Sequence, residues 1–264
     1  MIDQRVVESI RRYGTCRDDG SGRRRVFGDI GYPVGKEAEY AIIMGCFQPE
    51  AMPHVLRDLK ALLDHLGVSY TLLPKEHCCG WMPIGQPAVM ARNEEDIAGY
   101  RELSRGFVQE NFRQAKGLGV KSIVLFCGAC EPSYTNCAGD TDLAVISYSE
   151  LLDRYWKGGR LDRSIDYYAG CYRFRRRITE VPVDTGHAAR LLARVEGLEV
   201  NHLDNTRCCY IPPHMDELAA SVSSETVVTI CTGCYQNVRR KLAEKGGHRV
   251  LMLPELLLEA ARGA

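Results

Sequence analysis

The chain has 264 residues, 45% of them hydrophobic and 26% charged, which is the composition of a folded globular protein with room for two domains. Its 34 lysines and arginines balance its 34 aspartates and glutamates, so there is no overall field to attract nucleic acid or an anionic membrane. The first residues lack the profile of a secretory signal and no apolar run approaches the ~18–20 residues that cross a bilayer, which predicts a cytoplasmic protein without direct membrane insertion.

The chain begins with a segment, residues 1–38, that we predict to be an N-terminal extension. It has a short helical pattern followed by a polar, glycine-rich stretch at 17–22, and is expected to dock on a partner or to form a partly ordered arm. From residue 39 onward, a strand, a cysteine and a helix follow one another repeatedly. The predicted strands are 40–44, 69–73 and 122–126, and the predicted helices are 52–66 and 89–117.

The second half of the chain repeats this order. Its predicted strands are 165–169, 198–202 and 227–230, and its predicted helices are 185–195 and 236–245. Segments 145–152 and 251–257 are also similar to one another. Because Cys127 and Cys231 are 104 residues apart and Glu150 and Glu255 are 105 apart, the two halves share a register. This pattern predicts an internal duplication, with one domain at 39–160 and another at 161–264.

Strands that alternate with helices predict an α/β fold of two tandem, duplicated Rossmann-like domains with parallel sheets. In open parallel sheets, ligands gather beyond the carboxyl ends of the strands. The cysteines follow the predicted strands, so we expect the cysteine clusters to lie at those ends.

Ten of the twelve cysteines form two copies of one pattern, namely a single cysteine, an adjacent pair and a Cys-x-x-Cys. The first set is Cys46, Cys78, Cys79, Cys127 and Cys130, and the second set is Cys171, Cys208, Cys209, Cys231 and Cys234. Five thiols exceed the four that a structural zinc ion or a cubane iron–sulfur cluster takes. Adjacent Cα atoms lie roughly 3.8 Å apart, closer than the ~4.4–6.8 Å of an unstrained disulfide, so each pair is a poor disulfide. The spacing therefore favours a multi-iron site.

Three other interpretations of the ten cysteines stay open. They could serve packing alone, either Cys-x-x-Cys could be a thioredoxin-like dithiol, or each set could bind zinc with one thiol to spare. Cys16 and Cys137 stand outside both sets and are predicted to be free thiols.

The two motifs resemble the cysteine-rich CCG domain as it occurs twice in the B subunit of heterodisulfide reductase. The resemblance covers residue 40 to the C-terminus and includes the Gly-Cys steps at Gly45-Cys46 and Gly170-Cys171. It implies one [4Fe-4S] cluster of the non-cubane type in each set, with a bridging thiolate from the adjacent cysteines. It also implies an oxidoreductase that reduces or oxidises a disulfide or a related small sulfur-containing substrate. The implied partners are a ferredoxin-like iron–sulfur subunit of the C type and a flavin-binding subunit of the A type.

The second copy departs from this pattern, because Tyr210 follows its cysteine pair where the first copy has Gly80. If one site is atypical, we expect it to be the second. Arg173, Arg175 and Arg207 lie close to the second set in the sequence, where they could contact an anionic substrate or offset charge, or simply lie in solvent.

No glycine-rich dinucleotide fingerprint or phosphate loop opens either half, so we expect no nucleotide cofactor on this chain. Two further functions remain open at this stage. One is an electron-transfer subunit that serves another enzyme or a quinone pool, and the other is a zinc-stabilised scaffold without catalytic activity.

Overall fold

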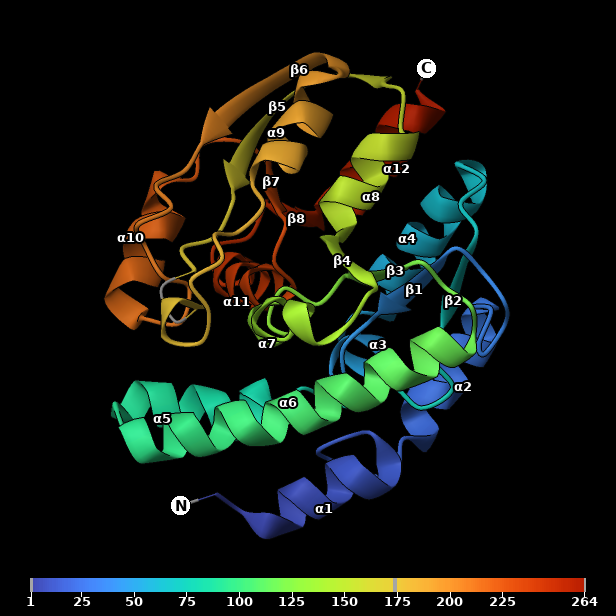
Figure 1. Cartoon of the computed structure of the whole chain (residues 1–264). Helices are drawn as coiled ribbons and strands as arrows, with labels where there is room; N and C mark the ends of the chain where they lie inside the picture. Colours follow the sequence, from blue (N-terminus) through green and yellow to red (C-terminus); the bar gives the residue numbers. More distant parts are fainter. Residues whose placement is uncertain (1, 173–174, 264) are drawn as a thin grey trace. The chain divides into compact units, whose positions relative to one another are not determined.

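The computed structural model describes residues 2–172 and 175–263. The chain divides into two compact units: unit 1 comprises Met1–Leu56, Ser69–Tyr148 and Phe174–Pro182, and unit 2 comprises Arg57–Val68, Ser149–Arg173 and Val183–Ala264. In the described part of the chain, each unit holds one parallel sheet of four strands with flanking helices (Figure 1). The predicted α/β fold with parallel sheets is confirmed.

The sheet of unit 1 has the strand order β2-β1-β3-β4. Its strands are β1 (Tyr40–Ile43), β2 (Tyr70–Leu72), β3 (Ser122–Leu125) and β4 (Ala144–Ser147). Every residue of the first three is buried, which is usual for a parallel sheet covered on both faces. The sequence predicted these three strands. Strand β4 is an additional one at the edge of the sheet, and only one of its four residues is buried.

Helices are present near the N-terminus and in the ranges predicted at 52–66 and 89–117, and further helices and turns lie between them. They are α1 (Gln4–Tyr13), α2 (Ser21–Ile30), α3 (Gln48–Ala51), α4 (Pro53–His65), the π-turn η1 (Trp81–Gly85), α5 (Gln86–Ala91), α6 (Glu94–Gly117), α7 (Glu131–Asn136) and the 3-10 turn η2 (Ala138–Asp140). The single helix predicted at 89–117 is interrupted by Arg92, whose φ of 55° ends α5. Asn93 then begins α6 by accepting a hydrogen bond from the Asp96 backbone N–H.

The N-terminal segment forms part of unit 1. Val7 and Ile10 of α1 are fully buried and belong to the same apolar cluster as strand β3 and the first set of cysteines. Helix α1 contacts α6 (Figure 1), and Lys75 Nζ donates to the carbonyl of Arg11 at 2.8 Å. Residues 2–38, which we expected to form an extension or a partly ordered arm, are thus part of a packed unit.

Unit 2 repeats the same sheet topology, with the strand order β6-β5-β7-β8. Its strands are β5 (Gly159–Tyr168), β6 (Val195–His202), β7 (Thr226–Thr229) and β8 (Arg249–Met252). The helices of the second half are α8 (Tyr148–Tyr155), the 3-10 turn η3 (Arg175–Arg177), α9 (Gly186–Ala193), α10 (Pro212–Ser221), α11 (Thr232–Ala243) and α12 (Leu253–Arg262). In both sheets the first strand pairs with the second and the third, and the third pairs with the fourth.

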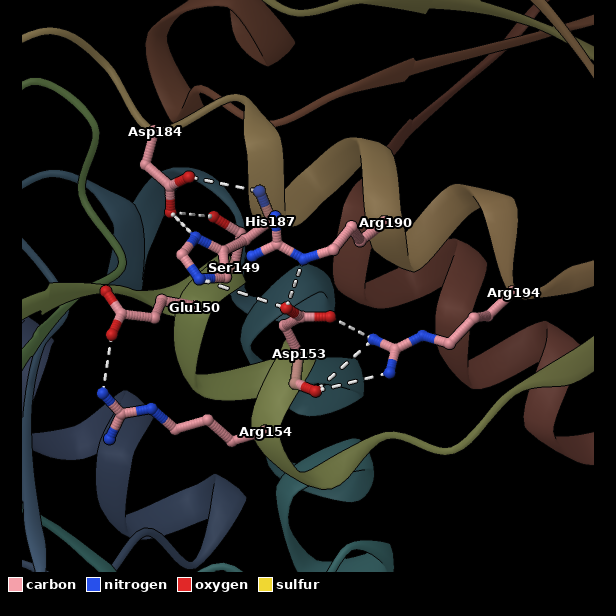
Figure 2. Close-up of polar contacts among 8 residues, drawn as sticks. All are labelled: Ser149, Glu150, Asp153, Arg154, Asp184, His187, Arg190 and Arg194. Atoms are coloured by element: carbon pink, nitrogen blue, oxygen red, sulfur yellow. Dashed lines mark hydrogen bonds and ion pairs between the residues drawn. The ribbon is translucent and has the colours of Figure 1, made fainter.

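A network of ion pairs joins α8 to α9 in unit 2 (Figure 2). Asp153, whose side chain is only 14% exposed, accepts from Arg190 Nε at 2.9 Å and pairs with Arg194. At the N-terminal end of α9, His187 Nδ1 lies 2.7 Å from Asp184 Oδ2. These contacts hold the two helices of this unit together. The position of His187 is explained by its contact with Asp184 and does not require a metal ion.

Within residues 2–172 and 175–263, none of the helices is both long and apolar enough to span a bilayer.

Candidate metal centres

The cysteines lie where the parallel strands end. Cys46 follows β1 and Cys127 follows β3, while Cys171 and Cys231 come after the corresponding strands β5 and β7. Since the carboxyl ends of parallel strands meet at one edge of a sheet, three loops of each unit converge there. The predicted position of the cysteine clusters is confirmed.

A glycine in a left-handed conformation precedes the first cysteine of each set. Gly45 has φ 89° and Gly170 has φ 93°, backbone angles that residues with a Cβ rarely adopt. A Cβ at Gly45 would lie 2.2 Å from Oε1 of Gln48 and 2.9 Å from the Cβ of Cys127. At the first set, Gly45 is therefore required both for the turn and for the close approach of two cysteine loops.

The first set forms a continuous group of thiols. Cys46 Sγ lies 3.0 Å from Cys78 Sγ, and Cys79 is within hydrogen-bond reach of Cys78 and Cys130. Cys130 is in turn hydrogen-bonded to Cys127. All five predicted residues of the first set thus meet at one place.

Cys16 joins this group, although the sequence placed it outside both sets. Its Sγ and those of Cys46 and Cys78 all lie within 4.8 Å of one another. Nothing in the spacing of the two cysteine motifs indicates this, because Cys16 reaches the group through the packing of α1. The other unassigned cysteine, Cys137, is buried beside α7, and burial raises its pKa to about 11.

The second set is also brought together. Cys171 and Cys208 are hydrogen-bonded, Cys209 Sγ lies 3.5 Å from Cys234 Sγ, and Cys234 is hydrogen-bonded to Cys231. The departure from the family pattern at Tyr210 thus does not remove any cysteine from this group.

Polar side chains hold the backbone and the sulfurs of the second pair. His214 Nδ1 accepts from the Cys208 backbone N–H at 3.2 Å, and Asn237 Nδ2 lies 3.6 Å from Cys209 Sγ. Both residues come from helices that follow a cysteine loop, α10 and α11.

Two N–H donors point at sulfurs of the first set. Nε2 of the buried Gln48 lies 3.0 Å from Cys127 Sγ, and the Gly80 backbone N–H lies 3.4 Å from Cys78 Sγ. Hydrogen bonds to sulfur stabilise negative charge there, and in metal centres they adjust the reduction potential.

Two buried polar residues fix the loops that carry the first set. The Glu76 carboxylate accepts from the backbone N–H groups of Met44 and Gly45 at 2.9 and 2.8 Å, and burial raises its pKa. Asn111 of α6 accepts from the His77 backbone N–H at 2.7 Å and donates to the His77 carbonyl at 2.8 Å. Together they position the turns on both sides of Cys46 and Cys78.

The thiols of the first set affect one another's ionisation strongly. Hydrogen bonds from Cys16, Cys46 and Cys79, together with burial, raise the pKa of Cys78 well above its ordinary value. Hydrogen bonds with Cys46, which has the larger effect, and with Cys78 lower the pKa of Cys16 to about 3. Crowded thiols cannot all ionise without a cation, and a bound metal ion would supply the positive charge that allows it. The donor set therefore fits a thiolate-bound metal group.

The three arginines predicted near the second set have different surroundings. Arg173 lies outside the described residues. Arg175 belongs to unit 1, is 5% exposed and lies 3.2 Å from the carboxylate of Glu131, the residue after Cys130. Arg207 is on the surface, where its Nε lies 2.7 Å from Glu217 Oε2.

A second group of ligand-type side chains is built differently. Glu150, Asp184 and His187 lie within 4.8 Å of one another in unit 2, but Glu150 pairs with Arg154 and Asp184 with His187 (Figure 2). The two carboxylates of this group already have partners within the chain, and that of Glu150 is paired with a guanidinium.

A comparison with protein families supports the interpretation of the first set. Residues 40–133 match the model of a cysteine-rich domain, CCG, and the match includes all five cysteines of that set. The resemblance to the CCG domain, which is typical of heterodisulfide reductase B-like proteins, is thereby confirmed for this part of the chain. No curated protein matches the chain.

Among the solved structures, one matches with a TM-score above 0.5, and that likeness shows the fold alone. A hypothetical protein from Helicobacter pylori shares 11% identity with a TM-score of 0.56, and the match covers 92% of this chain and 55% of that one. An aspartate racemase homologue from Pyrococcus horikoshii shares 10% identity over 84% of this chain and 96% of that one, with a TM-score of 0.35. The glutamate racemase from Francisella tularensis shares 11% identity over 87% and 79%, with a TM-score of 0.33.

Proposed function

We propose that this chain is the iron–sulfur catalytic subunit of a heterodisulfide reductase-like complex, which reduces or oxidises a disulfide or a related sulfur substrate. The observation that carries the proposal is the pair of thiol groups at equivalent strand ends of two duplicated units, one of them within a CCG domain. Each set would hold one [4Fe-4S] cluster, of the non-cubane type.

The number and arrangement of thiols favour a multi-iron group over a zinc ion. Zinc in a structural site takes four ligands in a tetrahedron, whereas each of these groups offers at least five thiols. An adjacent pair such as Cys78 and Cys79 contributes contacts in two directions, Cys78 toward Cys46 and Cys79 toward Cys130. Such a divided pair fits a metal group with more than one metal ion.

The proposed reaction needs two electrons and two protons for each disulfide, which yields two thiols. An iron–sulfur cluster supplies or accepts one electron at a time, so two clusters match the electron count. In the first unit, Gln48 and the Gly80 N–H would adjust the charge on the sulfurs through their hydrogen bonds. The guanidinium of the buried Arg175 lies 3.2 Å from the carboxylate of Glu131, the residue after Cys130, where its positive charge would offset part of the negative charge of a thiolate-bound cluster.

The proposed electron donors are other subunits. We propose two partners in the cytoplasm, a ferredoxin-like iron–sulfur subunit and a flavin-binding subunit. The flavin is assigned to another subunit because this chain has no glycine-rich nucleotide motif.

Metal analysis of protein purified without oxygen tests the cofactor. We expect about eight iron and eight acid-labile sulfide per chain, as two four-iron clusters require. Two zinc ions without sulfide would contradict the proposal and favour a structural scaffold.

A second measurement tests the reaction. The reduced complex is mixed anaerobically with a panel of disulfides, and released thiols are counted against electrons supplied. Two thiols per two electrons are expected for at least one disulfide. If no disulfide reacts while a quinone is reduced, the chain is an electron-transfer subunit and the catalytic assignment is wrong.

A further inference from the structure

We propose that Cys16 is a sixth thiol ligand of the metal group at the first set, so the two sites of this chain differ in ligand number. The inference rests on the proposed function only in requiring that the first set binds a metal group through its thiols. It assigns a role to the N-terminal segment that neither the CCG match, which begins at residue 40, nor the duplicated pattern contains.

The first argument is position. The Sγ atoms of Cys16, Cys46 and Cys78 all lie within 4.8 Å of one another, close enough to share one metal group. Cys78 is buried, whereas Cys16 and Cys46 are partly exposed, so Cys16 lies on the outer side of the thiol group. A metal ion bound at Cys46 and Cys78 would have the Cys16 thiol as a neighbour.

The second argument is that the fold fixes this position through the backbone. The Cys78 backbone N–H donates to the Gly14 carbonyl at 2.9 Å, which joins the turn before Cys16 directly to the cysteine pair. Gly14 has φ 76°, and a Cβ there would lie 2.5 Å from the carbonyl oxygen of Glu76. Only glycine allows the two backbones to approach this closely.

Side chains reinforce the same contact. Arg23 of α2 is buried and donates through Nη2 to the Glu76 carbonyl at 2.9 Å. The turn that contains Cys16 is also held internally, since Thr15 Oγ1 donates to the Asp18 carbonyl at 2.7 Å and Asp18 Oδ1 accepts from the Gly20 N–H at 2.6 Å. The orientation of Cys16 is therefore fixed from both sides of the turn.

Helix α1 anchors the segment in the core. Val7 and Ile10 are fully buried, and the burial of apolar side chains stabilises the docked helix. Arg17 stacks on the Phe47 ring, 4.4 Å from its centroid, directly beside Cys16 and Cys46. The ends of the turn are thus attached to the rest of unit 1 independently of any metal.

The second set lacks an equivalent residue. Residues 138–170, which precede Cys171, contain no cysteine. The chain therefore offers six thiols at the first site and five at the second, and the first site is the one that departs from the pattern. The loop at Tyr210 predicts instead that the second site is the atypical one, and this stays a prediction.

Chemical protection tests the inference on the unmodified chain. Protein with and without its metal group is treated anaerobically with iodoacetamide, and each cysteine is quantified by mass spectrometry. A partly exposed thiol reacts readily when free and slowly when bound to metal, so we expect Cys16 to react about tenfold more slowly in the loaded protein. Equal reaction of Cys16 in both forms, or its recovery in a disulfide in both, would overturn the assignment.

Matched variants provide a second readout. Cys16→Ser removes the thiol with little change of size, and Cys137→Ser removes a cysteine that lies outside the group. After reconstitution with ferrous iron and sulfide, Cys16→Ser should alter the electron paramagnetic resonance signal of one cluster, while Cys137→Ser leaves both unchanged. Circular dichroism confirms that each variant is folded. An unchanged signal in folded Cys16→Ser would contradict the inference.

Cobalt(II) separates this inference from the proposed function. Its thiolate complexes absorb in the near ultraviolet, and the absorbance is compared in the chain and in Cys16→Ser. If the chain takes up no iron and sulfide, yet cobalt protects Cys16 and the variant loses thiolate absorbance, the iron–sulfur proposal fails while Cys16 remains a ligand. If iron and sulfide bind and Cys16 is not protected, the iron–sulfur proposal stands and the assignment of Cys16 as a ligand fails.

Discussion

The turn at Gly45 offers a direct test of how the first site is built, through the substitution Gly45→Ala. The residue has φ 89°, and an added Cβ would lie 2.2 Å from Gln48 Oε1 and 2.9 Å from the Cys127 Cβ. The left-handed conformation alone costs a residue with a side chain about 1–2 kcal/mol. Overpacking in a buried site adds about 1–3 kcal/mol. We therefore expect the free energy of unfolding to fall by roughly 3 kcal/mol.

Gly119→Ala is the matched control for this substitution. Gly119 also has a left-handed φ, 70°, in the same unit, but a Cβ there would meet no atom within 4 Å. It should lose only the conformational part, about 1 kcal/mol. Unfolding of the metal-free proteins in urea gives both values, and metal analysis gives the iron bound by each.

The two variants should also differ in metal content. Gly45→Ala displaces Gln48 and Cys127 from each other, so the first set should lose iron, whereas Gly119→Ala should retain it. The reasoning is refuted if Gly45→Ala is no less stable than Gly119→Ala, or if it binds the same amount of iron. In that case the close approach of the two loops would not be a condition for the site.

Three further substitutions test other contacts. Asn111→Ala removes hydrogen bonds to both backbone groups of His77, so the free energy of unfolding measured in urea should fall by about 2–3 kcal/mol. A loss below about 1 kcal/mol would contradict the role given to Asn111. Gln48→Leu removes the hydrogen bond to Cys127 Sγ that stabilises negative charge on the sulfur, so the reduction potential of the first cluster should fall. A redox titration followed by electron paramagnetic resonance measures this, with the second cluster as the internal reference. Burial raises the pKa of Glu255 to about 7, above its value in the unfolded chain, so the folded state holds the proton more tightly. The free energy of unfolding should therefore decrease as the pH rises from about 4.5 to 7, by at most roughly 3 kcal/mol. Glu255→Gln should flatten this dependence, and an unchanged slope would assign it to another group.

Much of the fold can be predicted from the sequence because buried parallel strands leave a clear pattern. Strands such as Tyr40–Ile43 and Ser122–Leu125 are almost entirely apolar and end beside a cysteine loop, so the strands and the position of the sites can be predicted. Edge strands leave less of a pattern. Ala144–Ser147 is partly exposed, and its similarity to the segment at 251–257 was visible only as a repeat.

The residues that sequence reasoning missed reach the site through tertiary packing. Cys16 belongs to no cysteine motif, and the only local signal was the apolar pair Val7 and Ile10, one helical turn apart, which indicates a helix that packs on something. Its position four residues after Cys171 predicts that Arg175 lies near the second set. Its contact with Glu131 in unit 1 depends on the path of the chain, which spacing alone does not reveal.

The separation of the cysteines along the chain has a consequence for biosynthesis. Cys46 and Cys130 are 84 residues apart and meet only when β3 has paired with β1, and Cys16 adds a contact that spans 62 residues to Cys78. Contacts between residues so distant in sequence form late and slowly in folding. Each site can therefore assemble only after most of its unit has been synthesised and folded. Uptake of metal would then report completed folding, and a nascent chain that stalls before β3 would present reactive thiols instead of a finished site.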